Sequence, residues 1–181
     1  MIVKNSNGLS SRQGKDFIMK KIEIGEYNME IFQALCRSYF TSFLVDVKEG
    51  VYASISLAPW LTQLPEEGDY GELIHALVDG YIIEEYREEV ERKLSLKYIK
   101  QVLNKQEITD TKRSYYIDYQ SVRMGEKKWC RASIVLVNLD KEGGPERILF
   151  LIQDITEEKE RELKQQKSLQ EAYELADLAE R

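Results

Sequence analysis

The feature that most constrains the fold is the order in which β-type and helical patterns follow one another. Two short runs rich in β-branched and aromatic residues are followed by helical patterns, then by three further β-type runs and a last charged helix. Strands and helices segregated along the chain in this way are typical of α+β domains. The order predicts an α+β domain, with a five-stranded antiparallel sheet and helices on one face.

The first two β-type runs form a predicted hairpin. They cover residues 40–47 and 51–56, and Glu49-Gly50 between them is a turn signal. Before the hairpin we expect a short helix capped by Asn28, preceded by a flexible leader over residues 1–25, which begins with many Asn, Ser and Gly.

The middle of the chain is predicted to be helical. Residues 57–68 contain two prolines and are expected to form a loop, after which Asp69 and Glu72 resemble a capping box. Apolar residues then recur at helical spacing, at Tyr70, Leu73, Ile74, Leu77, Val78 and Tyr81. A charged helix over 84–94 and a third helix capped by Ser95 are expected to follow.

The last three strands are expected over residues 114–123, 128–139 and 146–153. Residues 124–126 and 141–145 supply the Gly and Pro that separate them as hairpin turns.

The C-terminal segment, residues 157–181, has no Gly or Pro and consists almost entirely of strong helix formers. It predicts a helix of about 37 Å. A weak, partly polar heptad seam runs through Ile155, Lys159, Glu162, Gln166, Leu169, Tyr173, Ala176 and Glu180. A solvated single helix is the alternative. We favour a parallel coiled coil that connects to a further domain, because the helical pattern reaches Arg181 without a stop signal.

Composition excludes several functions. The net charge of −6 argues against nucleic-acid binding. One His and two Cys, Cys36 and Cys130, cannot form a structural zinc site or a disulfide framework. No apolar run is long enough to span a membrane, and no signal peptide is evident. We expect a cytoplasmic protein without a cofactor.

Three motifs resemble the PAS family. The segment Asp154-Ile155-Thr156-Glu157-Glu158-Lys159 looks like the junction that closes many PAS domains, and Trp129-Cys130-Arg131 resembles the family's Trp-x-Arg strand. The hairpin Phe43-Leu44-Val45-Asp46-Val47 with Val51-Tyr52 is similar to the opening of many bacterial sensor PAS domains. The β-β-α-α-α-β-β-β order is also the PAS order. The resemblance implies a sensor domain over 26–156 and a signalling helix over 157–181.

The resemblance further implies a non-catalytic, homodimeric sensory module. Such a module would relay the binding of a small molecule or partner to an output domain, most simply a histidine kinase, because residues 169–181 resemble linkers in hybrid histidine kinases. A diguanylate cyclase as output, and a structural dimerisation module without ligand, are the alternatives. The expected relay residues are Trp129, Asp154, Ile155 and Thr156. The Asp154 carboxylate, and the Thr156 hydroxyl likewise, can accept from the first N–H groups of the last helix.

A ligand pocket is expected between the sheet and the helices. Strand alternation and the end of the amphipathic helix place the candidate lining residues there; they are Phe43, Val45, Val47, Tyr81, Ile134, Leu136, Phe150 and Ile152. The same positions also suit ordinary core residues, which is the simpler interpretation. His75 lies opposite the apolar stripe of its helix and is expected to face solvent, and Cys130 is read as a small apolar strand residue.

Overall fold

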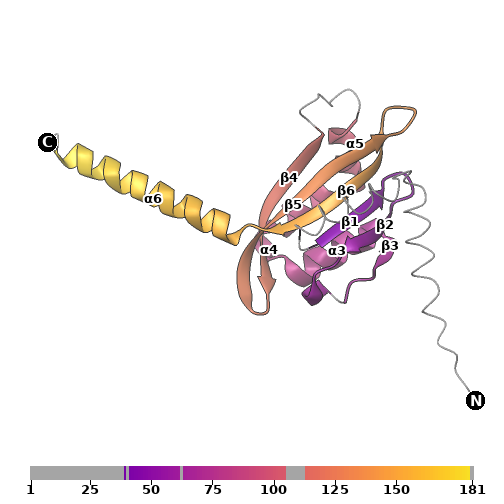
Figure 1. The fold of residues 1–181 in the computed structure, drawn as a ribbon, viewed down its shortest axis with the longest axis horizontal. Coiled ribbons are helices and arrows are strands. Elements are labelled where there is room, and N and C mark those ends of the chain that lie inside the picture. Colours follow the sequence, from indigo (N-terminus) through magenta and orange to yellow (C-terminus); the bar gives the residue numbers. More distant parts are fainter. Residues whose placement is uncertain (1–38, 40, 62, 105–112, 180–181) are drawn as a thin grey trace, which may run out of the picture.

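A computed structural model describes residues 39, 41–61, 63–104 and 113–179. Its centre is one antiparallel sheet in the order β3-β2-β1-β6-β5-β4 (Figure 1). The strands are β1 (Thr41–Asp46), β2 (Val51–Ser56), β3 (Glu67–Asp69), β4 (Ser114–Arg123), β5 (Glu126–Leu139) and β6 (Pro145–Asp154). The predicted helix capped by Asn28, the leader over 1–25 and Cys36 lie outside the described residues.

The sheet has six strands, so the prediction of five was wrong. The additional strand is β3, which pairs with β2 through Val51↔Asp69 and Tyr52↔Gly68 at the sheet edge. It lies at the end of the segment expected to be a loop, which also contains the 3₁₀ turn η1 (Pro59–Leu61). A strand of three residues is too short to show the alternation of apolar and polar side chains that marks a strand in a sequence. The two prolines before it also indicated a loop, so the sequence pattern did not reveal this strand.

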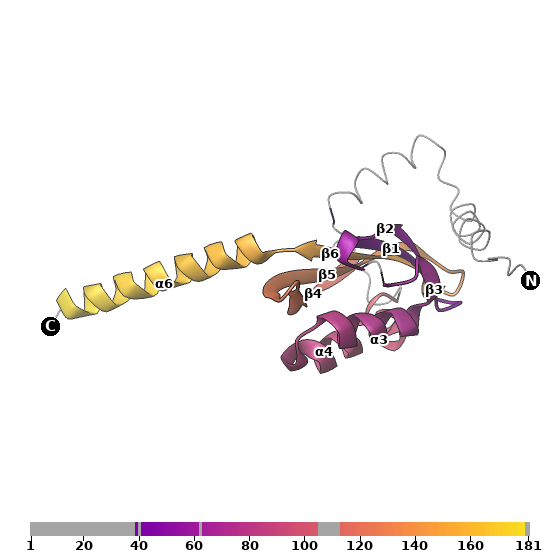
Figure 2. The same cartoon turned by 90° about the horizontal axis from the view of Figure 1, so that it is seen from below.

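Three helices pack against one face of the sheet; the first two are seen below it in Figure 2, and the third is labelled in Figure 1. They are α3 (Tyr70–Tyr81), α4 (Glu84–Leu94) and α5 (Leu96–Val102), with the first two at their predicted bounds. The Asp69 carboxylate accepts from the Glu72 N–H at 2.9 Å, and the Ser95 hydroxyl accepts from the Tyr98 N–H at 3.2 Å. Both predicted N-caps are therefore confirmed.

The turn between β4 and β5 is tighter than predicted. Met124 and Gly125 both have positive φ, of 52° and 82°, which is the geometry of a two-residue type I′ hairpin. Arg123 pairs directly with Glu126, so β5 begins two residues before its predicted start. The pairing of β4 with β5 therefore extends to Arg123, the last residue of β4.

The core lies between the sheet and the helices. Phe43 stacks on Phe150 with ring centroids 5.4 Å apart, and Tyr70 meets Phe150 edge-on at 6.3 Å. The Tyr70 hydroxyl, fully buried, donates to the Leu94 carbonyl at 2.9 Å. The apolar stripe predicted for α3 packs into this core. The element order, with β3 added, is that of the expected PAS-like fold.

The last element, α6 (Thr156–Ala179), continues from β6 and projects away from the domain (Figures 1 and 2). None of its residues is buried. At 100° per residue, Leu169 and Tyr173 share one side of the helix, whereas Leu175 and Leu178 fall on others. The helix is therefore held by its first turn and not by an apolar face.

Candidate functional site

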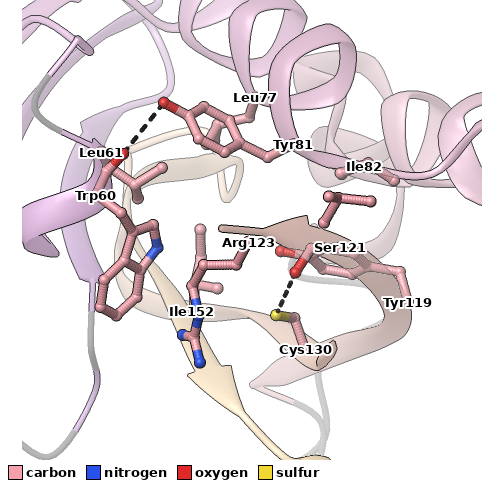
Figure 3. Close-up of a pocket in the computed structure, with 11 residues that line it drawn as sticks. Trp60, Leu61, Leu77, Tyr81, Ile82, Tyr119, Ser121, Arg123, Cys130 and Ile152 are labelled. Atoms are coloured by element: carbon pink, nitrogen blue, oxygen red, sulfur yellow. Dashed lines mark hydrogen bonds between the residues drawn. The ribbon is translucent and has the colours of Figure 1, made fainter. Parts of the chain in front are cut away.

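A small cavity lies where the C-terminal end of α3 faces β4, β5 and β6 (Figure 3). Its volume is about 30 Å³. The side chains around it come from η1, α3 and its cap, and the three C-terminal strands; they are Trp60, Leu61, Leu77, Tyr81, Ile82, Tyr119, Ser121, Val122, Arg123, Cys130 and Ile152. The site thus draws on segments far apart in the sequence.

The cavity wall is mostly apolar, with a few polar groups. The Ser121 hydroxyl and the Cys130 thiol lie 3.2 Å apart, and the Tyr81 hydroxyl donates to the Trp60 carbonyl at 3.4 Å. Burial raises the pKa of the Cys130 thiol, and it also raises the pKa of the Tyr119 hydroxyl well above its usual range. Both groups are therefore neutral at physiological pH.

Arg123 connects the cavity to the start of α6. Its guanidinium carbon lies 4.3 Å from the centroid of the Trp60 ring, and Figure 3 shows the two side chains next to each other. A guanidinium nitrogen of the same residue lies 2.6 Å from the Asp154 carboxylate. One side chain therefore contacts both the cavity wall and the last residue of β6.

Asp154 caps α6. Its carboxylate accepts from the Thr156 N–H at 3.0 Å, as predicted from the sequence. Burial by itself would raise the pKa of Asp154, but the hydrogen bonds from Thr156 and Arg123 outweigh that effect and lower it. The carboxylate is ionised at neutral pH and holds both partners.

Ile155 and Thr156 fasten the start of α6 to β5. The Ile155 N–H donates to the Trp129 carbonyl at 2.9 Å, and the Trp129 N–H donates to the Thr156 hydroxyl at 3.0 Å. The Ile155 side chain is buried. The expectation that the Thr156 hydroxyl caps the helix was wrong, because this hydroxyl accepts from a strand instead and ties the helix to the sheet.

A cluster of charged side chains gives the helix a second attachment. Arg131 binds Asp118 through two contacts of 2.7 and 3.0 Å and reaches Glu158 at 3.3 Å. Lys159 lies 3.1 Å from Asp118. Burial favours a higher pKa for Asp118, yet the hydrogen bonds from Arg131 and Lys159 prevail and hold it below its usual value. The paired strands β4 and β5 are thereby linked to the first turn of α6.

The structure brings the four predicted relay residues together at one junction, and it divides the predicted ligand-binding residues. Tyr81 and Ile152 line the cavity. The others do not line it: Phe43, Val45, Val47, Ile134 and Phe150 lie in the core, and Leu136 is partly buried against it. A role of these six in ligand binding stays a prediction. His75 faces solvent as expected, with 69% of its side chain exposed, and Cys130 is buried on its strand.

Several residues of the site were not found from the sequence. Trp60 was within an expected loop, and Arg123 was only the last residue of a predicted strand. Arg131 was part of the Trp-x-Arg motif, but the motif gave it no role. Alternation does place Asp118 and Arg131 on strands, yet their pairing depends on the register of β4 against β5, which the two-residue turn sets.

Comparison with known proteins finds similar solved structures only. No family model matches the chain, and no curated protein matches it. The chain is similar to a sensory box histidine kinase/response regulator from Burkholderia thailandensis, with 19% identity and a TM-score of 0.48 over 79% of this chain and 98% of that one.

Two further structures are similar at lower scores. One is the N-terminal domain of a diguanylate cyclase with PAS/PAC sensor from Marinobacter aquaeolei, with 16% identity and a TM-score of 0.44 over 66% of this chain and 97% of that one. The other is an RNA-binding light-oxygen-voltage receptor, with 11% identity and a TM-score of 0.44 over 74% of this chain and 35% of that one. These similarities concern the fold.

The described part of the chain contains no helix that is both long and apolar enough to cross a membrane. Within the same residues, no group of three or more His, Cys, Asp or Glu side chains is placed to hold a metal ion.

Proposed function

We propose that this chain is a non-catalytic PAS-like sensory module, which registers a small molecule in the cavity and transmits its binding to the segment that follows α6. The observation that carries the proposal is the position of Arg123, which lines the cavity and also pairs with the helix cap Asp154. A ligand that moves the Arg123 side chain changes the contacts of the first turn of α6 without any movement of the core.

The contacts of α6 suit such a role. The helix buries no side chain of its own, so its orientation depends on the hydrogen bonds and ion pairs of Asp154, Thr156, Glu158 and Lys159 and on the buried Ile155. Polar contacts of this kind contribute about 1 kcal/mol each. A ligand that binds two arrangements of the junction with different affinity is therefore able to shift their populations.

The chemistry of the cavity favours binding over catalysis. Two of its titratable groups, Cys130 and Tyr119, have raised pKa values and stay protonated at neutral pH, so neither is an activated nucleophile or a base. The alternative of a structural module without ligand is supported by the small volume of the cavity, about 30 Å³.

A screen with two readouts tests the proposal. Small metabolites are first screened by thermal unfolding, where a ligand at 100 times its dissociation constant stabilises the fold by about 2.7 kcal/mol. Amide hydrogen exchange is then measured over residues 156–160 with and without each ligand found. The proposal predicts changed exchange in these first-turn amides. A bound ligand that leaves them unchanged contradicts the relay, and a screen without any ligand favours the structural alternative.

Dimerisation through α6 is part of the proposal. Ile155 is buried in the domain and Lys159 pairs with Asp118, so the seam open to a second copy begins near Glu162 and has Leu169 and Tyr173 as its largest apolar members. Light scattering should show a dimer that the double change Leu169→Glu and Tyr173→Glu converts to a monomer, whereas Leu175→Glu, outside the seam, should not. A monomer from micromolar to millimolar concentration would contradict this part.

The proposed setting is a cytoplasmic signalling protein with a histidine kinase as output, or a diguanylate cyclase as the second candidate. Residues 169–181 resemble the linkers that precede output domains of both kinds. Assays of autophosphorylation and of cyclic dinucleotide synthesis on the full-length protein distinguish these outputs, and activity in neither assay would contradict both.

A further inference from the structure

We propose that the cavity takes a short-chain aliphatic carboxylate, of the size of acetate or propionate, which pairs with Arg123 in competition with Asp154. This inference deepens the proposed function and rests on it. It follows from the size of the cavity, from the chemistry of its wall and from the partner that Arg123 already has.

The size of the cavity sets the first limit. One water molecule needs roughly 10–15 Å³ by the same measure, so a volume of about 30 Å³ holds two to three molecules of that size. The methyl group of acetate or the ethyl group of propionate, with one and two carbon atoms, fits this space, and the carboxylate then lies beside the partly exposed Arg123 at its edge. A ligand of nucleotide or flavin size would require the packed side chains around the cavity to rearrange.

The wall selects the chemical class. Among the lining residues that the structure describes, Arg123 carries the one permanent charge, and a guanidinium binds carboxylates through its fork of N–H donors. Aliphatic side chains from Leu61, Leu77 and Ile152 offer an apolar surface for a short alkyl chain. A small molecule with one negative end and one apolar end satisfies both parts of this wall.

Asp154 shows that a carboxylate fits beside Arg123. The two side chains meet at 2.6 Å, and with 20% and 33% of their surfaces exposed the pair is in contact with water. Partly exposed pairs of this kind are weak, so a second carboxylate is able to compete for the guanidinium. Trp60, at 4.3 Å from the guanidinium carbon, keeps that group next to the cavity during the exchange.

The exchange also accounts for the transmission step. When a ligand takes the guanidinium, Asp154 keeps the Thr156 N–H but loses its cationic partner. The carboxylate that caps α6 is then less firmly held, and the first turn becomes easier to displace.

Binding is tested with sodium propionate as the probe and propionamide as its neutral isostere, both at matched ionic strength. The chain has two tryptophans, so Trp129→Phe leaves Trp60 as the single tryptophan reporter next to Arg123. Calorimetry on the unaltered chain is measured in parallel, in case the Trp129 variant folds poorly. We expect saturable binding of propionate and none of propionamide.

Arg123→Gln should weaken propionate binding roughly ten- to hundredfold, which corresponds to the loss of a charged hydrogen bond. Arg113→Gln is the matched control, because Arg113 is exposed and does not line the cavity. Equal binding of propionate and propionamide, or unchanged binding in Arg123→Gln, would overturn the inference.

Hydrogen exchange over residues 156–160 separates the failure of this inference from the failure of the proposed function. If carboxylates do not bind but another small molecule changes the exchange, the inference is wrong and the sensory role stands. If propionate binds through Arg123 without any change in exchange, the ligand class is supported and the relay is contradicted.

Discussion

The two ends of the core are built differently, although the same sheet and helices form both. At one end, Phe43, Tyr70 and Phe150 pack as aromatic rings with almost no exposed surface. At the other end, Trp60 and Arg123 lie beside a cavity. The filled end depends on apolar burial, which is strong and tolerates little change, whereas the hollow end depends on weaker polar contacts that a ligand is able to replace.

The helix α6 starts next to the hollow end. Its first contacts are with Trp129, Asp118 and Arg131 on β4 and β5, and with Asp154 at the end of β6. The difference between the ends therefore separates stability from transmission: changes at the filled end should unfold the domain, and changes at the hollow end should alter α6 while the domain stays folded.

The largest expected effect belongs to the filled end. Phe150→Ala removes a ring that packs against Phe43 and Tyr70, and it should lower the free energy of unfolding by about 3–5 kcal/mol in urea denaturation. Tyr81→Phe, its counterpart at the cavity, removes only a long hydrogen bond of 3.4 Å and should cost less than about 1 kcal/mol. Similar losses in both variants would remove the distinction between the two ends.

Ile155→Ala should have the next largest effect, because this buried side chain lies where the sheet becomes α6. The expected loss is about 2–3 kcal/mol, together with faster hydrogen exchange at the start of α6. Leu163→Ala, which changes a side chain that is 58% exposed on the same helix, should stay within about 0.5 kcal/mol of the unaltered protein. An equal effect of the two changes would show that the junction is not anchored by Ile155.

The smallest effect concerns pH. Asp118 and Asp154 both have lowered pKa values in the folded domain, so their contribution to stability is present above the unfolded-state pKa of about 4 and is lost as the pH falls through their folded values. Urea denaturation from about pH 7 to about pH 3 should show this loss.

Asp118→Asn should cost about 1 kcal/mol at neutral pH and make the stability less dependent on pH below about 4. Glu142→Gln removes an exposed carboxylate from the β5–β6 turn and should keep the dependence of the unaltered protein. A profile that Asp118→Asn leaves unchanged would mean that the charged cluster around Arg131 does not hold α6.

Much of the fold was predictable from the sequence because local patterns specify it. Apolar spacing placed α3, the caps at Asp69 and Ser95 marked two helix starts, and the β-branched runs placed β1, β2, β4, β5 and β6. The strand β3 escaped because three residues carry no period. The exposed helix α6 was predicted from propensity alone, which needs no tertiary contact.

The candidate site was predictable only in part. The junction of Trp129, Asp154, Ile155 and Thr156 follows from neighbours in sequence and from one recognisable motif. The cavity does not, because it depends on where packing is incomplete, and that is set by the shapes of side chains from η1, α3, β4, β5 and β6 together. Arg123 was predicted to end a strand, but its contacts with Trp60 and Asp154 join segments far apart in the sequence, and the strand pattern does not show them.

A double-mutant cycle between the cavity wall and the helix cap tests the central claim most directly. Trp60→Leu, Asp154→Asn and their combination are compared by urea denaturation, in the unaltered chain and in the Arg123→Gln variant. If Arg123 couples the two sites, the change in unfolding free energy of the double variant should differ from the sum of the two single changes by about 0.5–1 kcal/mol in the unaltered chain. In the Arg123→Gln variant the two single changes should add up. Additivity within about 0.3 kcal/mol in both backgrounds would show that the cavity and α6 are independent.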